Sequence, residues 1–194
     1  MSGSIQRRNL IKTASLGLGA LGAAVVTERP VYARQPTLLY DVSGNGTTIG
    51  LSGPLDPSGQ PTNGTAFVIE GFLYKPGTLT PGAGDGVLPD GQPQYPDALV
   101  GVWFCSGWFV RKALAEVNGP VAFTTQLFDT IPGTPGAQVL LTSAYEQSSA
   151  SYLRSIIGGT GKYAKIRGQV TQFSYGPNTS GGFNYQEAFE LYYL

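Results

Sequence analysis

From residue 37 onward the chain alternates between apolar and polar residues with a period of two, which is typical of half-buried β-strands. Turn-forming residues separate these stretches, as in Gly44-Asn45-Gly46 and Pro132-Gly133-Thr134-Pro135-Gly136. The pattern predicts eight strands linked mainly by short turns, and eight strands close well into an antiparallel barrel. The predicted ranges are 37–42, 47–51, 65–74, 98–110, 120–130, 137–146, 163–175 and 183–193.

Composition agrees with an all-β fold. The 194 residues include 28 Gly and 14 Pro, aromatic residues reach 11%, and charged residues make up only 12%. A helical bundle needs many more Glu, Lys, Ala and Leu, whereas turn-rich β-proteins have this profile. We therefore predict an eight-stranded antiparallel β-barrel that forms a single domain over residues 34–194.

Two segments interrupt the alternation. Residues 52–64 read as a loop rich in Pro, Gly and Asn, and residues 75–97 form a longer loop with five glycines and five prolines. A connection of that length in a compact domain is often a lid, a binding loop or a mobile flap. A plain surface excursion is the other interpretation, and the sequence does not decide between them.

The first 33 residues have the order of an export signal. Gln6-Arg7-Arg8-Asn9-Leu10-Ile11-Lys12 resembles the twin-arginine motif, and an uncharged run of residues 13–26 follows it. Val31-Tyr32-Ala33 predicts cleavage after Ala33, with Ala23-Ala24 as a second site. The alternative is an uncleaved anchor, but the run is shorter than the roughly 20 residues that span a bilayer. We expect export to the periplasm or beyond, with no stable membrane anchor after cleavage.

Charge and residue usage narrow the chemistry. Residues 34–194 carry eight basic and eleven acidic residues without a dense basic patch, which disfavours nucleic acid as a partner. Cys105 is the single cysteine, so no intramolecular disulfide forms. The chain has no histidine, which excludes His-based triads and most zinc or haem sites. The sequence predicts no cofactor and no metal site.

The most informative segment is Ile157-Gly158-Gly159-Thr160-Gly161-Lys162-Tyr163-Ala164-Lys165-Ile166-Arg167-Gly168-Gln169-Val170. It predicts a tight glycine turn, over which Tyr163 folds back, followed by a strand. A phosphate-binding loop would need a helix after the glycines, but the residues from 166 onward alternate as in a strand. The segment resembles the signature of dirigent proteins and allene oxide cyclases, including the strand that ends in Ser155-Ile156-Ile157 just before the glycines.

This resemblance implies a calycin-like barrel that holds a hydrophobic small molecule in its lumen and guides its cyclisation or stereoselective coupling. Such an activity would make the protein an isomerase or cyclase of secondary metabolism. Related barrels assemble as trimers, so a homo-oligomer is expected. Two other functions stay open: a non-catalytic carrier similar to lipocalins, and a structural envelope protein with a filled barrel.

Polar residues among apolar strand neighbours are the catalytic candidates. Glu70 is predicted to share a face with Val68, Phe72 and Tyr74, where a raised pKa would suit proton transfer; otherwise it faces solvent. Glu187 and Glu190 are three positions apart and so face opposite sides of a regular strand. Because Glu187 shares its face with several aromatic residues, it is the better lumen candidate.

The remaining candidates are an arginine, a cysteine and several aromatic residues. Arg167 matches the arginine of the resembled segment, a position used in the dirigent pocket; the alternative is an ion pair at the barrel end. Cys105 is expected to be a buried thiol, and allene oxide cyclases also place a cysteine in the cavity. The catalytic set is Glu70, Glu187, Arg167 and Tyr74, and the ligand-binding set is Cys105, Tyr40, Tyr145 and Phe72.

Overall fold

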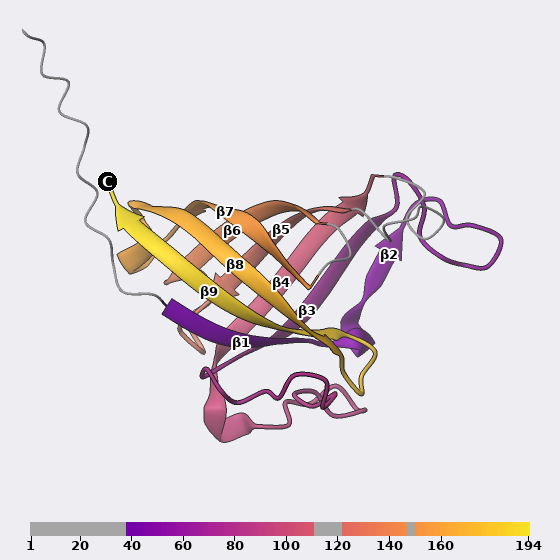
Figure 1. Cartoon of the computed structure of the whole chain (residues 1–194), viewed down its shortest axis with the longest axis horizontal. Coiled ribbons are helices and arrows are strands. Elements are labelled where there is room, and N and C mark those ends of the chain that lie inside the picture. The colour runs from indigo at the N-terminus through magenta and orange to yellow at the C-terminus, as the bar shows by residue number, and fades with distance from the viewer. Residues whose placement is uncertain (1–37, 111–121, 147–149) are drawn as a thin grey trace, which may run out of the picture. The chain divides into compact units, whose positions relative to one another are not determined.

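The computed structural model describes residues 38–110, 122–146 and 150–194 (Figure 1). The predicted export signal lies outside these ranges. Within them, no helix is long and apolar enough to cross a bilayer. The strands are β1 (Leu38–Gly44), β2 (Gly50–Ser52), β3 (Ala66–Tyr74), β4 (Leu99–Phe109), β5 (Ala122–Asp129), β6 (Val139–Glu146), β7 (Ser151–Gly159), β8 (Ile166–Pro177) and β9 (Phe183–Tyr193).

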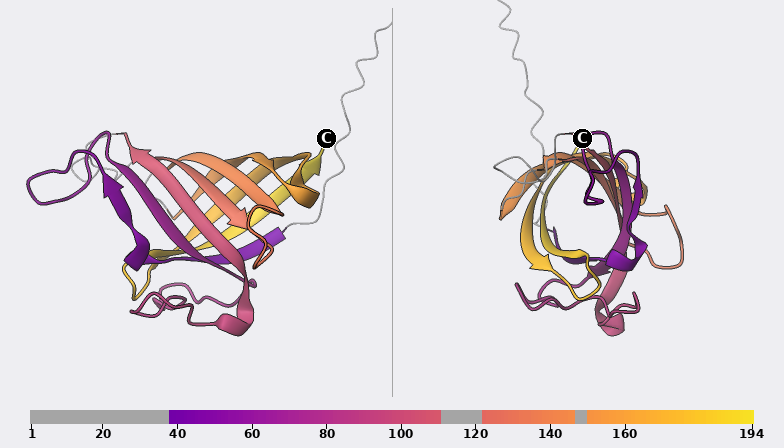
Figure 2. Two further views of the ribbon diagram at one scale, coloured as in Figure 1. Left: turned by 180° about the vertical axis from the view of Figure 1, so that it is seen from behind. Right: turned by 90° about the vertical axis from the view of Figure 1, so that its right-hand side faces the viewer.

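The strands form a closed antiparallel barrel of eight strands, as predicted (Figure 2, right). From β3 to β9 each strand pairs with the next one along the chain, and β1 closes the barrel between β9 and β3. The short strand β2 continues the wall of β1: β1 pairs with residues 71–74 of β3, and β2 pairs with residues 66–68. Closure leaves only short strand edges unpaired.

The predicted strand count is right, but the membership of the set is partly wrong. The prediction counted 37–42 and 47–51 as two barrel strands. In the structure β1 and β2 pair with different parts of β3, so together they occupy the place of one strand. It also omitted β7 as a whole, although Ser155-Ile156-Ile157 was expected to end a strand. Arg154 occupies the inward face of β7, so the usual apolar signal is broken there.

An apolar cluster fills the barrel at the end where the chain passes from β7 to β8. Tyr163, which the sequence predicted to fold back over that turn, is buried and belongs to this cluster. Gly161 adopts a positive φ of 57°, and Gly159 lies so close to the Val139 carbonyl that an added Cβ would be 2.5 Å from its oxygen. The cluster comprises Val42, Leu73, Phe128, Leu140, Ile156, Tyr163, Ile166, Val170, Phe189 and Leu191, among others.

The long loop over residues 75–97 packs along the outer wall of the barrel (Figure 1). Its Leu79 and Val87 are buried. The Leu79 amide donates to Asp41 Oδ2 over 2.9 Å, and Asn184 Nδ2 donates to the Asp85 carbonyl over 2.8 Å. The segment therefore covers part of the wall and is held against it by these contacts.

Candidate functional site

A cavity of about 240 Å³ opens inside the barrel between β3, β4, β5 and β9. Ile49, Leu51 and Phe183 line it and are about half exposed, which places its mouth at the barrel end where β4 stops and β5 starts. The lining is mostly apolar, with a few polar groups. It consists of Gly44, Ile49, Leu51, Phe67, Ile69, Trp103, Cys105, Phe109, Ala122, Gln126, Glu146, Phe183 and Tyr185.

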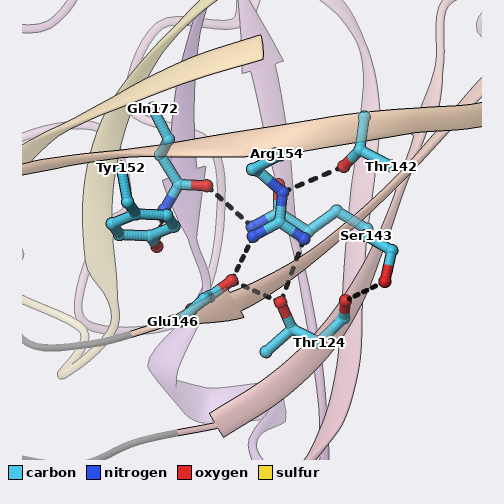
Figure 3. A network of polar contacts seen from close by, with 8 residues as sticks. Thr124, Thr142, Ser143, Glu146, Tyr152, Arg154 and Gln172 are labelled. Atoms are coloured by element: carbon cyan, nitrogen blue, oxygen red, sulfur yellow. Dashed lines mark hydrogen bonds and ion pairs between the residues drawn. The ribbon is translucent and has the colours of Figure 1, made fainter. Parts of the chain in front are cut away.

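A buried arginine organises the polar part of the interior (Figure 3). Arg154 is 1% exposed, and its Nη1 forms an ion pair with Glu146. Its Nε donates to Thr142 Oγ1 and its Nη2 to Thr124 Oγ1, each over 3.0 Å. The Thr124 hydroxyl in turn donates to Glu146. Because Glu146 also lines the cavity, a molecule bound there would lie next to an ion pair whose two charges compensate each other.

A chain of amides links the cavity wall to the opposite strands. Gln126 Nε2 donates to Gln172 Oε1 over 3.0 Å, and Gln172 Nε2 donates to the Tyr152 hydroxyl. These side chains come from β5, β8 and β7. Gln172 and Tyr152 lie beside Arg154 in Figure 3. In this chain of amides the Nε2 of the Gln126 amide is used, and its Oε1 has no partner among the described residues.

Glu187 is fully buried, and neither of its carboxyl oxygens has a hydrogen-bond partner in the described part of the chain. Burial raises the pKa of Glu187 well above its usual value, against the opposing effect of the Arg154 charge. The uncharged carboxylic acid is therefore favoured, and it keeps its proton for donation. Trp103 Nε1 is a third buried polar group without a partner in the described ranges. Each such group costs about 1–3 kcal/mol of stability.

Cys105 lines the same cavity from β4. Burial raises the pKa of its thiol far above the ordinary value, and Glu146 adds to that effect. The side chain is therefore a neutral thiol, which suits a packing role better than nucleophilic attack. Within the described ranges, no three His, Cys, Asp or Glu side chains come together as a metal site.

Known structures share this architecture, although no family model and no curated protein matches the chain. A pterocarpan synthase dirigent protein superposes with a TM-score of 0.58 at 15% identity, covering 94% of this chain and 99% of that one. A second pterocarpan synthase dirigent protein gives a TM-score of 0.56 at 14% identity, covering 81% and 94%. The fold is a dirigent-like barrel.

Two further similar structures are named for other reactions. Pyocyanin demethylase matches with a TM-score of 0.51 at 17% identity, over 80% of this chain and 99% of that one. A nonspecific heme-binding cyclase that catalyses a [4 + 2] cycloaddition matches with a TM-score of 0.50 at 12% identity, over 82% and 65%. At such identities the likeness establishes the fold alone.

Three of the predicted site residues face the interior of the dirigent-like barrel. Glu187 lies on the inner face of β9, as predicted, two residues from the cavity-lining Tyr185. Cys105 lines the cavity. Tyr40 also points inward, but it packs edge-on against Phe189 in the apolar cluster, with ring centroids 5.9 Å apart.

Three other predicted site residues lie on the outer wall. Glu70 is exposed beside β2, and the prediction that it faces the lumen is wrong. Its amide donates to Thr48 Oγ1 over 3.0 Å. Tyr145 is 49% exposed, and Phe72 packs against the ring of Tyr74 outside the barrel. Both faces of these strands carry apolar residues, so alternation alone does not identify the inner face.

Tyr74 and Arg167 also lie away from the cavity. Tyr74 is buried under the 75–97 loop, where its hydroxyl donates to the Gly86 carbonyl over 2.6 Å and burial raises its pKa to about 12. Alternation places Tyr74 on the same face as Val68, Glu70 and Phe72, as the sequence predicted, but that face is the outer wall and not the lumen. Arg167 is exposed near the closed end of the barrel and donates to the Ile166 carbonyl over 2.7 Å.

Sequence reasoning missed the polar centre of the barrel. Arg154 and Tyr152 belong to the omitted strand β7, and Glu146 is the neighbour of the chosen Tyr145 on the other face of β6. One signal was present in the sequence: Tyr152, Arg154 and Ile156 alternate with Leu153 and with serines at 151 and 155. The two residues of a buried ion pair lie on different strands and are polar, so they do not produce the local apolar pattern from which buried strand positions are predicted.

Proposed function

We propose that this barrel binds a compact, mainly apolar organic molecule in its cavity and guides the cyclisation or stereoselective coupling of that molecule. One observation carries the proposal: an apolar cavity opens beside buried polar groups, among them an acid without a partner. A barrel filled only with side chains would offer no such space. A purely apolar lumen would offer no group to move a proton.

The cavity supports a role in positioning. Its volume of about 240 Å³ lies just below the roughly 300–1,000 Å³ of drug-sized sites, so it suits a compact ligand. Phe67, Ile69 and Phe109 form rigid apolar walls that restrict the conformations of a flexible substrate. Holding a reactive molecule in one folded shape removes entropy from the barrier to ring closure, which is a large contribution to rate.

Glu187 supports a role in proton transfer. In its uncharged form it donates a proton to an oxygen of the bound molecule, and the resulting carboxylate takes a proton back once the ring has closed. Arg154 lies close enough to lower the pKa of Glu187 and therefore stabilises the transient carboxylate. General acid catalysis of this kind contributes about 10²–10⁴-fold to a rate.

Three of the four similar structures support the proposal of ring formation by their names, while the fourth, pyocyanin demethylase, is named for a different reaction. Two of the similar structures are named as pterocarpan synthase dirigent proteins, and a third is named for a cycloaddition. All three carry out a ring-forming or synthase reaction by name on the same barrel architecture. This supports, for the present chain, a reaction that shapes a bound molecule.

Native mass spectrometry of the protein purified from its own host, followed by extraction of retained compounds, tests the proposal. The expected result is one retained hydrophobic compound, with conversion of its precursor by the native protein and by Glu70→Gln. Glu187→Gln is expected to bind the compound while turnover falls at least about 100-fold. Glu70 is a matched control because it is a strand glutamate on the outer wall.

A carrier function similar to that of lipocalins is the second candidate, and the predominantly apolar lining of the cavity favours it. It predicts retention of the compound without any conversion, in the native protein and in both glutamine variants. Absence of any bound compound, together with no binding of apolar probes, contradicts the cyclase and carrier functions alike.

Export is part of the proposal. The resemblance of residues 6–12 to a twin-arginine motif, with Ala33 before the start of the barrel domain, supports it. The mature protein is expected to begin at Arg34 and to leave the cytoplasm. N-terminal sequencing of the protein recovered from the periplasm or medium tests this, and a replacement of Arg7 and Arg8 by Lys is expected to retain the precursor inside the cell.

A further inference from the structure

Three buried polar groups without hydrogen-bond partners in the described chain surround the cavity or lie next to its wall. Trp103 Nε1 and Gln126 Oε1 belong to residues that line the cavity, and Glu187 lies two positions from Tyr185, which lines it as well. The three residues are 2%, 1% and 0% exposed. Folded proteins pair nearly all such groups with protein atoms, ordered water or a ligand, so these atoms are available to a molecule that displaces water from the cavity.

The two lining residues present groups of opposite hydrogen-bonding character. An indole Nε1–H only donates. The Gln126 Nε2 donates a hydrogen bond to Gln172, and the Gln172 Nε2 in turn donates a hydrogen bond to the Tyr152 hydroxyl. Gln126 therefore offers a carbonyl oxygen that only accepts. A matching molecule has an acceptor for Trp103 and an O–H or N–H donor for Gln126.

The charge of the interior is also settled by geometry. The Arg154 guanidinium forms an ion pair with Glu146 and donates hydrogen bonds to Thr124 and Thr142. A carboxylate ligand would compete with Glu146 for Arg154 and repel Glu146. A cationic ligand would compete with Arg154 for Glu146. Either exchange leaves a charge poorly compensated in a low-dielectric interior.

We infer that the cavity selects an uncharged compact molecule that accepts a hydrogen bond from Trp103 and donates one to Gln126. This inference rests on the proposed function, because it specifies the class of molecule for the same cavity. Gln126 is then a specificity-determining residue, and its orientation depends on Gln172 and Tyr152. The walls select for an apolar body, and the two polar groups select for a hydroxyl or N–H next to an acceptor.

Calorimetric titration with 2-naphthol, 2-methoxynaphthalene and 2-naphthoate tests the inference. These probes share a ring system and differ in the donor and in charge. The native protein is expected to bind 2-naphthol about three- to tenfold more tightly than 2-methoxynaphthalene, as one hydrogen bond predicts, and to bind 2-naphthoate most weakly. Gln126→Met is expected to remove the preference for 2-naphthol. Gln169→Met, an exposed residue on β8, is the matched control and is expected to keep it.

A second variant keeps the inference testable if Gln126→Met does not fold. Trp103→Phe removes the indole donor and is expected to abolish any preference for 2-methoxynaphthalene over naphthalene. Binding of all probes without preference, tightest binding of 2-naphthoate, or an unchanged preference in Gln126→Met overturns the inference and leaves the proposed function intact. Failure of every probe and of every host extract to bind overturns the proposed function itself.

Discussion

Glu187 and Arg154 illustrate two ways in which a barrel interior holds an ionisable side chain. Arg154 keeps its charge because Glu146 and two threonine hydroxyls compensate it. Glu187 has no hydrogen-bond partner in the described residues, so burial favours its uncharged form. In the first arrangement every charged group is satisfied within the protein, whereas in the second the acid keeps its proton and has no protein acceptor among the described residues. The proposed chemistry therefore belongs to Glu187, and Arg154 positions the surrounding groups.

The raised pKa of Glu187 makes stability depend on pH. The unfolded chain ionises this residue near its ordinary pKa while the folded protein keeps the proton, so its contribution to stability falls as pH rises above about 4.5 toward the raised value. Glu187→Gln removes this penalty. We expect a higher Tm than that of the native protein at pH 8, by roughly 2–4 °C per kcal/mol gained, and no difference near pH 4. Thermal unfolding over this pH range measures it, and a constant difference would contradict the account.

At the scale of the elements, the sequence predicted the regular strands well and the polar ones badly. Strands β3, β4, β5, β6 and β9 lie within about two residues of their predicted ranges, because apolar alternation marks a wall with one face inside. Strand β7 was missed and Glu70 was placed on the wrong face. Both errors have one cause: this barrel buries polar residues inside and exposes apolar ones outside, for example Arg154 and Val68. Alternation reports two faces and does not say which of them is enclosed.

The Arg154 network is expected to hold β5, β6 and β7 together. Arg154→Met leaves Glu146 without its counterion and two threonines without a donor, and we expect a loss of about 3 kcal/mol in the free energy of unfolding. Arg167→Met, at an exposed position, is expected to change it by less than about 0.5 kcal/mol. Urea unfolding of both variants measures the difference. Equal losses would show that the buried arginine contributes nothing specific.

The cover formed by residues 75–97 is expected to depend on the close approach of Gly86 to β1. A Cβ at Gly86 would lie 2.5 Å from Ser43 Oγ, whereas one at Gly82 would meet nothing within 4 Å. Both glycines have a positive φ, so alanine strains the backbone at either position. Gly86→Ala is therefore expected to cost about 1–3 kcal/mol more than Gly82→Ala and to expose the loop amides to hydrogen exchange. Equal exchange in the two variants would contradict the tight packing.

At the scale of the whole molecule, the outer wall carries an apolar row that the fold leaves uncovered in the described structure. Trp108, Phe123 and Tyr145 lie side by side on β4, β5 and β6, and they are 52%, 45% and 49% exposed. A row of this kind is unusual on the surface of a monomer. It agrees with the expectation, from the resemblance to trimeric barrels, that the protein assembles as a homo-oligomer.

Light scattering after size-exclusion chromatography tests that expectation. The native protein is expected to elute as an oligomer, and Phe123→Lys is expected to shift it toward the monomer because it buries a charge in the contact. Ser106→Lys, at an exposed position on β4, is the matched control and is expected to leave the mass unchanged. A native protein that is monomeric at all accessible concentrations would contradict assembly through this face.

The central claim is that the cavity between β3, β4, β5 and β9 is where a small molecule binds. Ala122 lines this cavity and is 6% exposed, so Ala122→Phe fills the space with a ring. Native mass spectrometry of this variant, beside Ala188→Phe at a half-buried position on β9, is the most direct measurement. We predict that the retained compound disappears from Ala122→Phe and stays with Ala188→Phe, both variants being folded by circular dichroism. Equal retention by the two folded variants would contradict binding in this cavity.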